Sequence, residues 1–165
     1  MKIYKIYISD NYRLIEATPV LDNFKLQIHD YSSLSSMKFD FCNINREFFG
    51  DITVVDNSSL LAFSEKAISV FPEKKYISLP GIENYKLLEL PIIDALDYKK
   101  SKIDYFKTSP NQLKRIRKYR FLKERIKNID IFTLPIKGES AFATELFVHK
   151  YIEANLTGIE FHEIK

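Results

Sequence analysis

The sequence contains little of the material that several common kinds of site need. It has one cysteine, Cys42, in 165 residues, so no disulfide can form within the chain. Four glycines are too few to build the usual glycine loop that cradles a phosphate. No apolar run approaches the length that crosses a bilayer, and the first residues lack the continuous apolar block of a signal peptide. We therefore expect a cytoplasmic protein that has no membrane segment.

The residues that are present describe an ordinary soluble globule. Hydrophobic residues make up 45% and charged residues 28%, as in folded and not in disordered chains. The length suits one domain over residues 1–165. Ten tyrosines and thirteen phenylalanines favour sheet and aromatic packing over a helical bundle. The net charge of +3 is too small to imply a nucleic-acid partner by itself.

The last third of the sequence, residues 131–164, has the clearest pattern: strand, turn, short helix and closing strand. Apolar residues recur there at helical spacing and predict one buried stripe, made of Phe147, Val148, Tyr151, Ile152 and Leu156. We predict a helix over about 148–156, which Gly158 ends because glycine adopts positive φ without strain. Glu160 and His162 then alternate with apolar residues, which predicts a strand over about 159–164.

The remaining patterns are shorter. They predict several strands, near residues 2–8, 24–29 and 39–42, and a loop over 9–19. A second short helix is predicted over about 64–71. It begins either near Ser58 or at Ser64, whose hydroxyl can accept a bond from a free N–H of the first turn. Each predicted helix joins an aliphatic run to a strand, and duplication and convergence both explain this weak echo. The expected fold is a single α+β domain with a mostly antiparallel or mixed sheet and two short helices.

Charge is segregated along the chain. Between Gln112 and Lys127 there are eight Lys or Arg residues against one acid, whereas residues 130–165 carry six acids against three lysines. The periodicity of the basic segment favours a helix and its aromatic content favours a strand, so its structure stays open. A basic stripe can follow a phosphate backbone, but it is also typical of a solvated surface. Segregated charge suits partner choice better than catalysis.

Candidate catalytic and metal-binding residues each have a simpler interpretation. Glu160 and His162 could be two metal ligands on one strand face, but no third ligand has matching spacing. Cys42 could pair with a histidine, but it lacks a local signature, and a structural thiol is favoured. Asp94 and Asp97 are better explained as turn and cap residues than as a carboxylate pair. We therefore expect no catalytic residue, no metal and no cofactor.

Several short motifs, taken in order, resemble a known family. The ending has I-D-I-F-T-L, followed by L-F-V-H-K-Y-I-E-A-N-L-T-G-I-E-F; the centre has F-S-E-K-A-I and D-A-L-D-Y-K-K-S. Together these are similar to the eleventh family of bacterial immunity proteins from polymorphic-toxin systems, over about residues 52–164. Residues 1–51 have no clear match beyond a typical start. Thr133 stands where the family usually has Arg, and His149 where it has a serine that caps the helix.

The resemblance implies an α+β domain that is not an enzyme. It implies that this domain binds a cognate toxin, which we expect a neighbouring gene to encode, and neutralises it by occluding it. It also favours a strand for residues 115–121 and Ser64 as the first helix cap. The two charged segments supply the residues expected to contact the toxin, which are Arg115, Arg117, Tyr119, Arg120, Glu145, Glu153 and Glu160. The alternative function is a nucleic-acid-binding module that uses residues 112–127.

Overall fold

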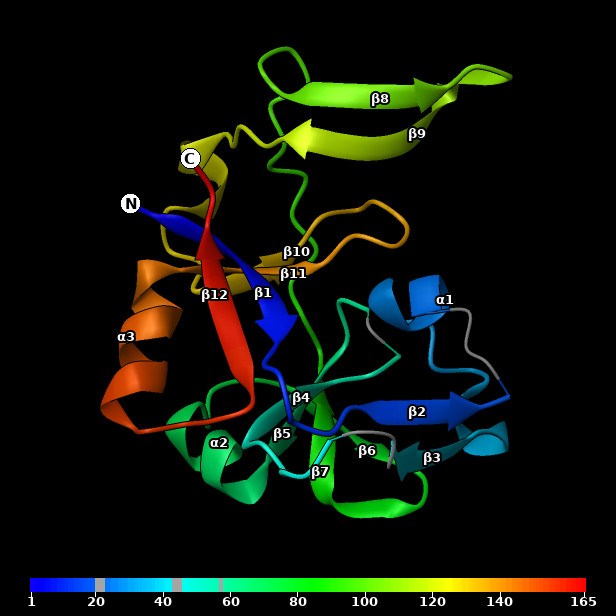
Figure 1. Cartoon of the computed structure of the whole chain (residues 1–165), viewed down its shortest axis with the longest axis vertical. Helices are drawn as coiled ribbons and strands as arrows, with labels where there is room; N and C mark the ends of the chain where they lie inside the picture. Colours follow the sequence, from blue (N-terminus) through cyan, green and yellow to red (C-terminus); the bar gives the residue numbers. More distant parts are fainter. Residues whose placement is uncertain (20–22, 43–45, 57) are drawn as a thin grey trace.

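The computed structural model describes residues 1–19, 23–42, 46–56 and 58–165 (Figure 1). Short helices alternate with many short strands. The helices are α1 (Asn23–Gln27), α2 (Glu65–Val70) and α3 (Glu145–Glu153), with 3-10 helices η1 (Leu34–Ser36) and η2 (Lys123–Ile126). The strands are β1 (Ile3–Ile8), β2 (Ile15–Thr18), β3 (Lys38–Phe41), β4 (Ile52–Val54), β5 (Leu61–Ser64), β6 (Tyr76–Leu79), β7 (Ile82–Leu88), β8 (Lys102–Phe106), β9 (Ser109–Lys118), β10 (Ile131–Thr133), β11 (Ala141–Thr144) and β12 (Ile159–Glu163).

Two four-stranded antiparallel sheets have the same internal arrangement. The central sheet has the order β4-β5-β7-β6, and the C-terminal sheet has the order β10-β11-β1-β12. In each sheet a two-stranded hairpin leads directly into a helix, and the strand after that helix lies at the far edge of the sheet. A fourth strand pairs between the hairpin and that edge strand. Strands β7 and β1 are these fourth strands. The echo between the two helix regions is confirmed, as is the α+β class with open, mostly antiparallel sheets.

Aromatic side chains from both sheets and both longer helices form one core. The rings of Phe71, after α2, and Phe147, in α3, stack with their centres 4.5 Å apart, and both side chains are fully buried. Phe63 on β5 meets both rings edge-on. Such pairs add about 0.5–1.5 kcal/mol beyond the burial of their area. Figure 1 shows α2 and α3 on the same side of the molecule.

A close approach between two backbone segments joins the two sheets. Gly158 has φ +109°, and a Cβ built there would lie 2.0 Å from the carbonyl oxygen of Ile52 at the start of β4. The amide of Ile52 donates to the carbonyl of Thr157 at 3.0 Å. Gly158 therefore serves this contact between β4 and β12. The prediction that it ends the helix is wrong, because α3 stops earlier and Asn155 takes positive φ, at +50°.

The bounds predicted for the last helix were too late by about three residues. Helix α3 runs over Glu145–Glu153 instead of 148–156, with Thr144 as its extended N-cap residue. His149, expected at the cap, lies exposed inside the helix. Ile152 was expected in the buried stripe but is 63% exposed. The apolar stretch A-F-A-T, residues 141–144, is compatible with either a helix or a strand, and it forms β11. The sequence pattern therefore did not show where the helix begins. The closing strand is confirmed as β12.

Two N-terminal predictions were also wrong, while the open alternatives are now resolved. Residues 24–29 were expected to form a strand, but α1 covers Asn23–Gln27; the loop expected over 9–19 contains β2. The buried amide of Gln27 donates to the carbonyl of Leu134 at 2.8 Å, a distant partner that favours the helix. Helix α2 begins after Ser64, whose hydroxyl accepts from Ala67 N. The basic segment is a strand to Lys118 and then the short helix η2.

Candidate protein-binding surfaces

Strands β8 and β9 form a two-stranded hairpin, residues 102–118, which we name the arm (Figure 1). Near its base, the paired residues Ile103 and Ile116 pack against the apolar cluster beneath the C-terminal sheet. Farther out, the rings of Tyr105 and Phe106 are exposed. The arm contains six Lys or Arg residues and one acid, Asp104. It is a cationic projection with aromatic groups near its tip.

Two of the residues expected to contact a toxin lie on the arm and share one partner. The Nε atoms of Arg115 and Arg117 donate to the same oxygen, Oδ2 of Asp104, at 2.6 and 2.7 Å. Hydrogen bonds from Arg117 and then Arg115 hold the pKa of Asp104 below its usual value. Both arginine side chains nevertheless remain 59–62% exposed. The two side chains can therefore contact a partner protein while they stay hydrogen-bonded to Asp104.

Tyr119 and Arg120, also expected to contact a toxin, are held within the protein. Lys5 Nζ donates at 2.9 Å to both the Tyr119 hydroxyl and Glu139 Oε1, and the Tyr119 hydroxyl donates to Glu139 Oε2 at 2.8 Å. Burial is the largest cause that raises the pKa of Tyr119 to about 12. Arg120 Nη1 donates to the carbonyl of Lys165 at 2.6 Å. These two residues hold elements together.

The three expected acids lie apart from the arm and from one another. Glu145 and Glu153 are the first and last residues of α3, and Glu160 is on β12. Glu160 and His162 lie on one strand face as predicted, with 3.4 Å between the carboxylate and the imidazole. Within the described ranges, no group of three or more His, Cys, Asp or Glu is placed to hold a metal ion. The seven expected residues therefore do not form one surface.

The other chemical candidates have structural settings. Cys42 is a free, buried thiol in the core, in agreement with the structural interpretation. Asp97 accepts hydrogen bonds from the backbone amides of Lys99 and Lys100 at 3.1 Å, so it is a turn residue, as favoured. Among the described residues, no helix is both long and apolar enough to span a bilayer.

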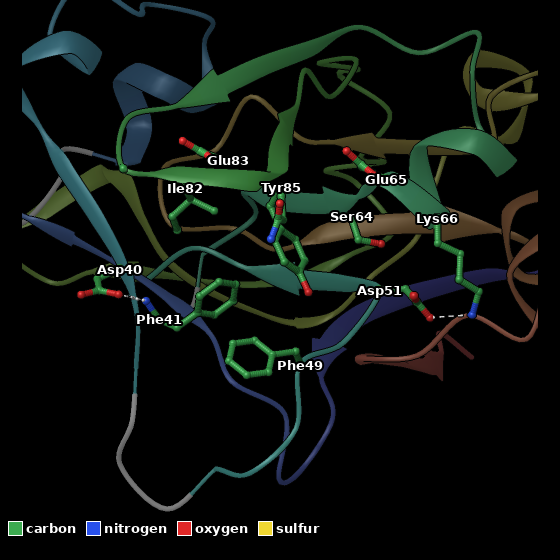
Figure 2. A pocket seen from close by; sticks show the side chains of 12 residues that line it. Asp40, Phe41, Phe49, Asp51, Ser64, Glu65, Lys66, Ile82, Glu83 and Tyr85 are labelled. Carbon is green, nitrogen blue, oxygen red and sulfur yellow. Dashed lines mark hydrogen bonds and ion pairs between the residues drawn. The ribbon is translucent and has the colours of Figure 1, made fainter.

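A groove of about 610 Å³ opens at the end of the central sheet (Figure 2). Four separate chain segments build it: the end of β3, the stretch before β4, the junction of β5 with α2, and the turn from β6 to β7. We name it the acidic groove. Its lining residues are Asp40, Phe41, Phe49, Asp51, Ser64, Glu65, Lys66, Gly81, Ile82, Glu83, Asn84 and Tyr85.

Three aromatic rings make the apolar part of the acidic groove. The ring of Phe41 meets Phe49 and Tyr85 edge-on, with ring centres 4.8 and 5.2 Å apart. The Tyr85 hydroxyl donates to the carbonyl of Gly50 at 2.7 Å, and burial raises the pKa of this phenol. Phe49 is 54% exposed. The guanidinium carbon of Arg13 lies 4.7 Å from the centre of the Phe49 ring, so this ring already holds a cation.

Carboxylates surround these rings. Four acids and one cation are among the described residues that line the acidic groove. Lys66 Nζ donates to Asp51 Oδ2 at 3.0 Å and to the carbonyl of Asn155, and Thr157 also donates to Asp51. Asp51 and Lys66 therefore satisfy each other and fix the wall nearest α2. The remaining acids, Asp40, Glu65 and Glu83, give the opening a negative charge (Figure 2).

Sequence reasoning did not find the acidic groove. Its lining residues come from positions 40–85. The motif F-S-E-K-A-I marks the segment at Ser64, but it indicates a helix start and not a groove. Pro80-Gly81 is a typical turn sequence, but nothing in the sequence shows that this turn lies against β3. Gly81 has φ +88°, and a Cβ there would lie 3.2 Å from the carbonyl oxygen of Phe39. The site depends on this tertiary contact.

The protein is of the α+β class, and its described surface has exposed regions that combine charged and aromatic side chains. Such regions are typical of surfaces that bind other proteins. Residues 89–165 match a family model described as Immunity protein family (Imm11), which confirms the resemblance seen in the sequence. The matched residues include the arm, β10, β11, α3 and β12. A comparison with curated protein sequences found no match.

Proposed function

We propose that this protein is a cytoplasmic immunity protein that binds one cognate toxin domain, encoded by a neighbouring gene, and neutralises it by covering its active surface. The match of residues 89–165 to the immunity family carries this proposal. Neutralisation of this kind requires a stable surface and no chemical step. The exposed arm and the acidic groove are surfaces of that kind, and the proposal assigns the protein no catalytic role.

The sequence-based residues give one proposal for the contact. Arg115 and Arg117 are the exposed members of the expected set on the arm, and they would meet an acidic toxin surface. Glu145, Glu153 and Glu160 would instead meet a basic one. Because these groups lie on different elements, they can be tested separately by charge reversal.

The test is growth rescue. The toxin domain encoded by the adjacent gene is expressed from an inducible promoter, with and without this protein. We expect growth to be restored and the two proteins to purify together as a complex. A toxin that still kills in the presence of the folded protein, with no complex formed, would end the proposal. Replacing both Arg115 and Arg117 with Glu tests whether the arm is the contact.

The second candidate function is nucleic-acid binding by the arm and the following basic residues, up to Lys127. It is supported by the six basic residues of the arm and by the exposed rings of Tyr105 and Phe106, on which bases could stack. Binding through phosphates weakens steeply as salt is added. Titration of a fluorescent single-stranded oligonucleotide at two salt concentrations distinguishes the functions, because no signal at low salt removes this candidate.

A further inference from the structure

We propose that the acidic groove is the surface that receives the toxin, and that the toxin inserts a lysine or arginine flanked by apolar residues. This inference rests on the proposed function and names the chemistry of the partner. It differs from the arm proposal in the sign of the toxin surface, which here must be cationic. Four observations support it: concavity, aromatic content, charge and rigidity.

The acidic groove has the composition of an energetic centre in a protein interface. Such centres combine aromatic anchors with a rim that excludes water. The ring centres of Phe49 and Tyr85 lie 4.8 and 5.2 Å from that of Phe41, and Phe49 is more than half exposed. Covering its ring would remove a large apolar area from water. A partner residue with an aliphatic stem could supply that cover.

The charges select a cationic partner. Asp40, Glu65 and Glu83 surround the opening, whereas Lys66, the cation among the described lining residues, is occupied by Asp51 and the carbonyl of Asn155. The Phe49 ring holds the Arg13 guanidinium at 4.7 Å, which shows that its face suits a cation. An incoming lysine or arginine would find aromatic faces for its stem and carboxylates for its charge.

The acidic groove is already formed in the free protein. The Tyr85 hydroxyl is fixed to the carbonyl of Gly50 at 2.7 Å, and Thr157 holds the Asp51 carboxylate from the C-terminal side. The turn at Gly81 packs against the backbone of Phe39. Preorganised surfaces lose little conformational entropy when they bind. Binding energy is then available for affinity.

The distribution of charge over the whole molecule agrees with this choice. Figure 1 shows the arm at one end of the long axis and the β6–β7 turn, beside the acidic groove, at the other. A cationic toxin would be repelled by the arm and attracted by the acidic groove. Such fields orient partners during diffusional encounter and raise association rates. The arm would then help recognition without contact.

The experiment uses the complete protein, the adjacent-gene toxin domain and pairs of matched variants. Phe49→Ala is compared with Phe48→Ala, because both rings are 54% exposed and only Phe49 lines the acidic groove. Glu83→Lys is compared with Glu124→Lys, because both are exposed acids, only Glu83 lines the acidic groove, and the change in net charge is the same. Urea unfolding verifies that all variants fold.

We expect Phe49→Ala to raise the Kd for the toxin by about 30-fold or more, as for a central interface residue. Glu83→Lys should lower the association rate and abolish growth rescue. Phe48→Ala and Glu124→Lys should bind like the wild type. If the Phe49 and Glu83 variants bind normally while wild-type rescue holds, the acidic groove is not the site and only this inference fails.

A second measurement separates this inference from failure of the proposed function. The blocked peptide acetyl-Arg-Leu-Arg-amide is titrated into the protein, and backbone amide resonances are followed by nuclear magnetic resonance. Shifts centred on Phe49 and Glu83, absent with acetyl-Glu-Leu-Glu-amide, support the inference even if the chosen toxin is not neutralised. The absence of groove shifts, with no groove-dependent binding of the toxin, overturns it.

Discussion

The phenol groups of Tyr119 and Tyr151 hold their protons more tightly in the folded protein than an exposed tyrosine does in water. Burial is the largest cause in both, and it raises each pKa from 10.0 to about 12. The Tyr151 hydroxyl donates to the carbonyl of Ile159 at 3.1 Å, which links α3 to β12. An ionised phenol in either place would lack solvation.

We therefore predict that the free energy of unfolding falls between about pH 10 and about pH 12. A pKa that is higher in the folded state stabilises the fold fully below the unfolded-state value, and this stability is lost as the pH rises through the folded-state value. Urea unfolding followed by circular dichroism over this range measures it. Tyr151→Phe should show a shallower decline, and an equally steep decline would contradict the assignment.

The buried charges of Lys5 and Glu139 predict an asymmetric pair of mutational effects. Glu139 is only 8% exposed, and Lys5 Nζ lies 2.9 Å from its Oε1. Burial lowers the pKa of Lys5, but the hydrogen bonds that Lys5 donates to Tyr119 and Glu139 outweigh it, so the pKa is raised. Lys5→Met leaves a buried carboxylate without its cation and should cost about 3–5 kcal/mol. The double variant Lys5→Met/Glu139→Met should cost less, measured by urea unfolding in a double-mutant cycle.

At this scale, a single residue's chemistry was easier to predict than its environment. Cys42 as a structural thiol and Asp97 as a turn residue could be inferred because both interpretations depend on local sequence. Tyr119 was expected to contact a toxin because it lies among arginines in the sequence. Its partners Lys5 and Glu139 are 114 and 20 positions away, so the sequence did not reveal that it is part of an internal network.

Helix α2 depends on its first turn because it has only six residues. The Ser64 hydroxyl accepts the amide proton of Ala67 at 3.3 Å, as the sequence predicted for a cap. We predict that Ser64→Ala lowers stability by about 1 kcal/mol. Ser69→Ala in the same helix is the matched control, because its exposed hydroxyl bonds only to the carbonyl of Lys66. Equal midpoints of urea unfolding for the two variants would contradict the role of the cap.

Element types were predicted well where local signals agreed and poorly where a distant partner decided. The edge strand β12 and the start of α2 follow from alternation and a capping serine. The alternation over residues 24–29 is typical of a strand, yet α1 forms there, with Gln27 bonded to carbonyls on the β10 side of the molecule. Helix α3 begins at Glu145, about three residues before the predicted start. The apolar run before it is compatible with a helix or a strand, and it forms β11. Periodicity alone cannot assign such a run.

The joint between the two sheets gives a prediction for the whole molecule. Gly158 and Gly138 both have positive φ, at +109° and +74°, but a Cβ at Gly138 meets nothing within 4 Å. Gly138→Ala should cost about 1–2 kcal/mol, from the backbone conformation alone. Gly158→Ala must in addition displace the Ile52 carbonyl, and we expect more than about 3 kcal/mol. Similar losses in thermal unfolding would show that the contact with β4 is unimportant.

The acidic groove shows why a site can escape a sequence-based prediction when the fold class does not. Fold class depends on the type and order of elements, which repeated local patterns indicate. The acidic groove requires that four segments between residues 40 and 85 meet at one end of the central sheet. Neither the pairing of β5 with β7 nor the contact of Gly81 with β3 has a local signature. The basic charge of residues 112–127, in contrast, was recognised because it lies within one continuous segment, although the sequence did not show that residues 112–118 form a hairpin with β8.

The position of β1 has a consequence for how the protein is made. The partners of β1 among the described strands are β11 and β12 of the C-terminal sheet, whose residues are 141–144 and 159–163. At typical rates of translation, a nascent β1 waits on the order of ten seconds for these neighbours. Its apolar residues would meanwhile be open to chaperones on the ribosome. The C-terminal sheet can close only after β12 is released, so a chain that stops before β12 would lack this sheet.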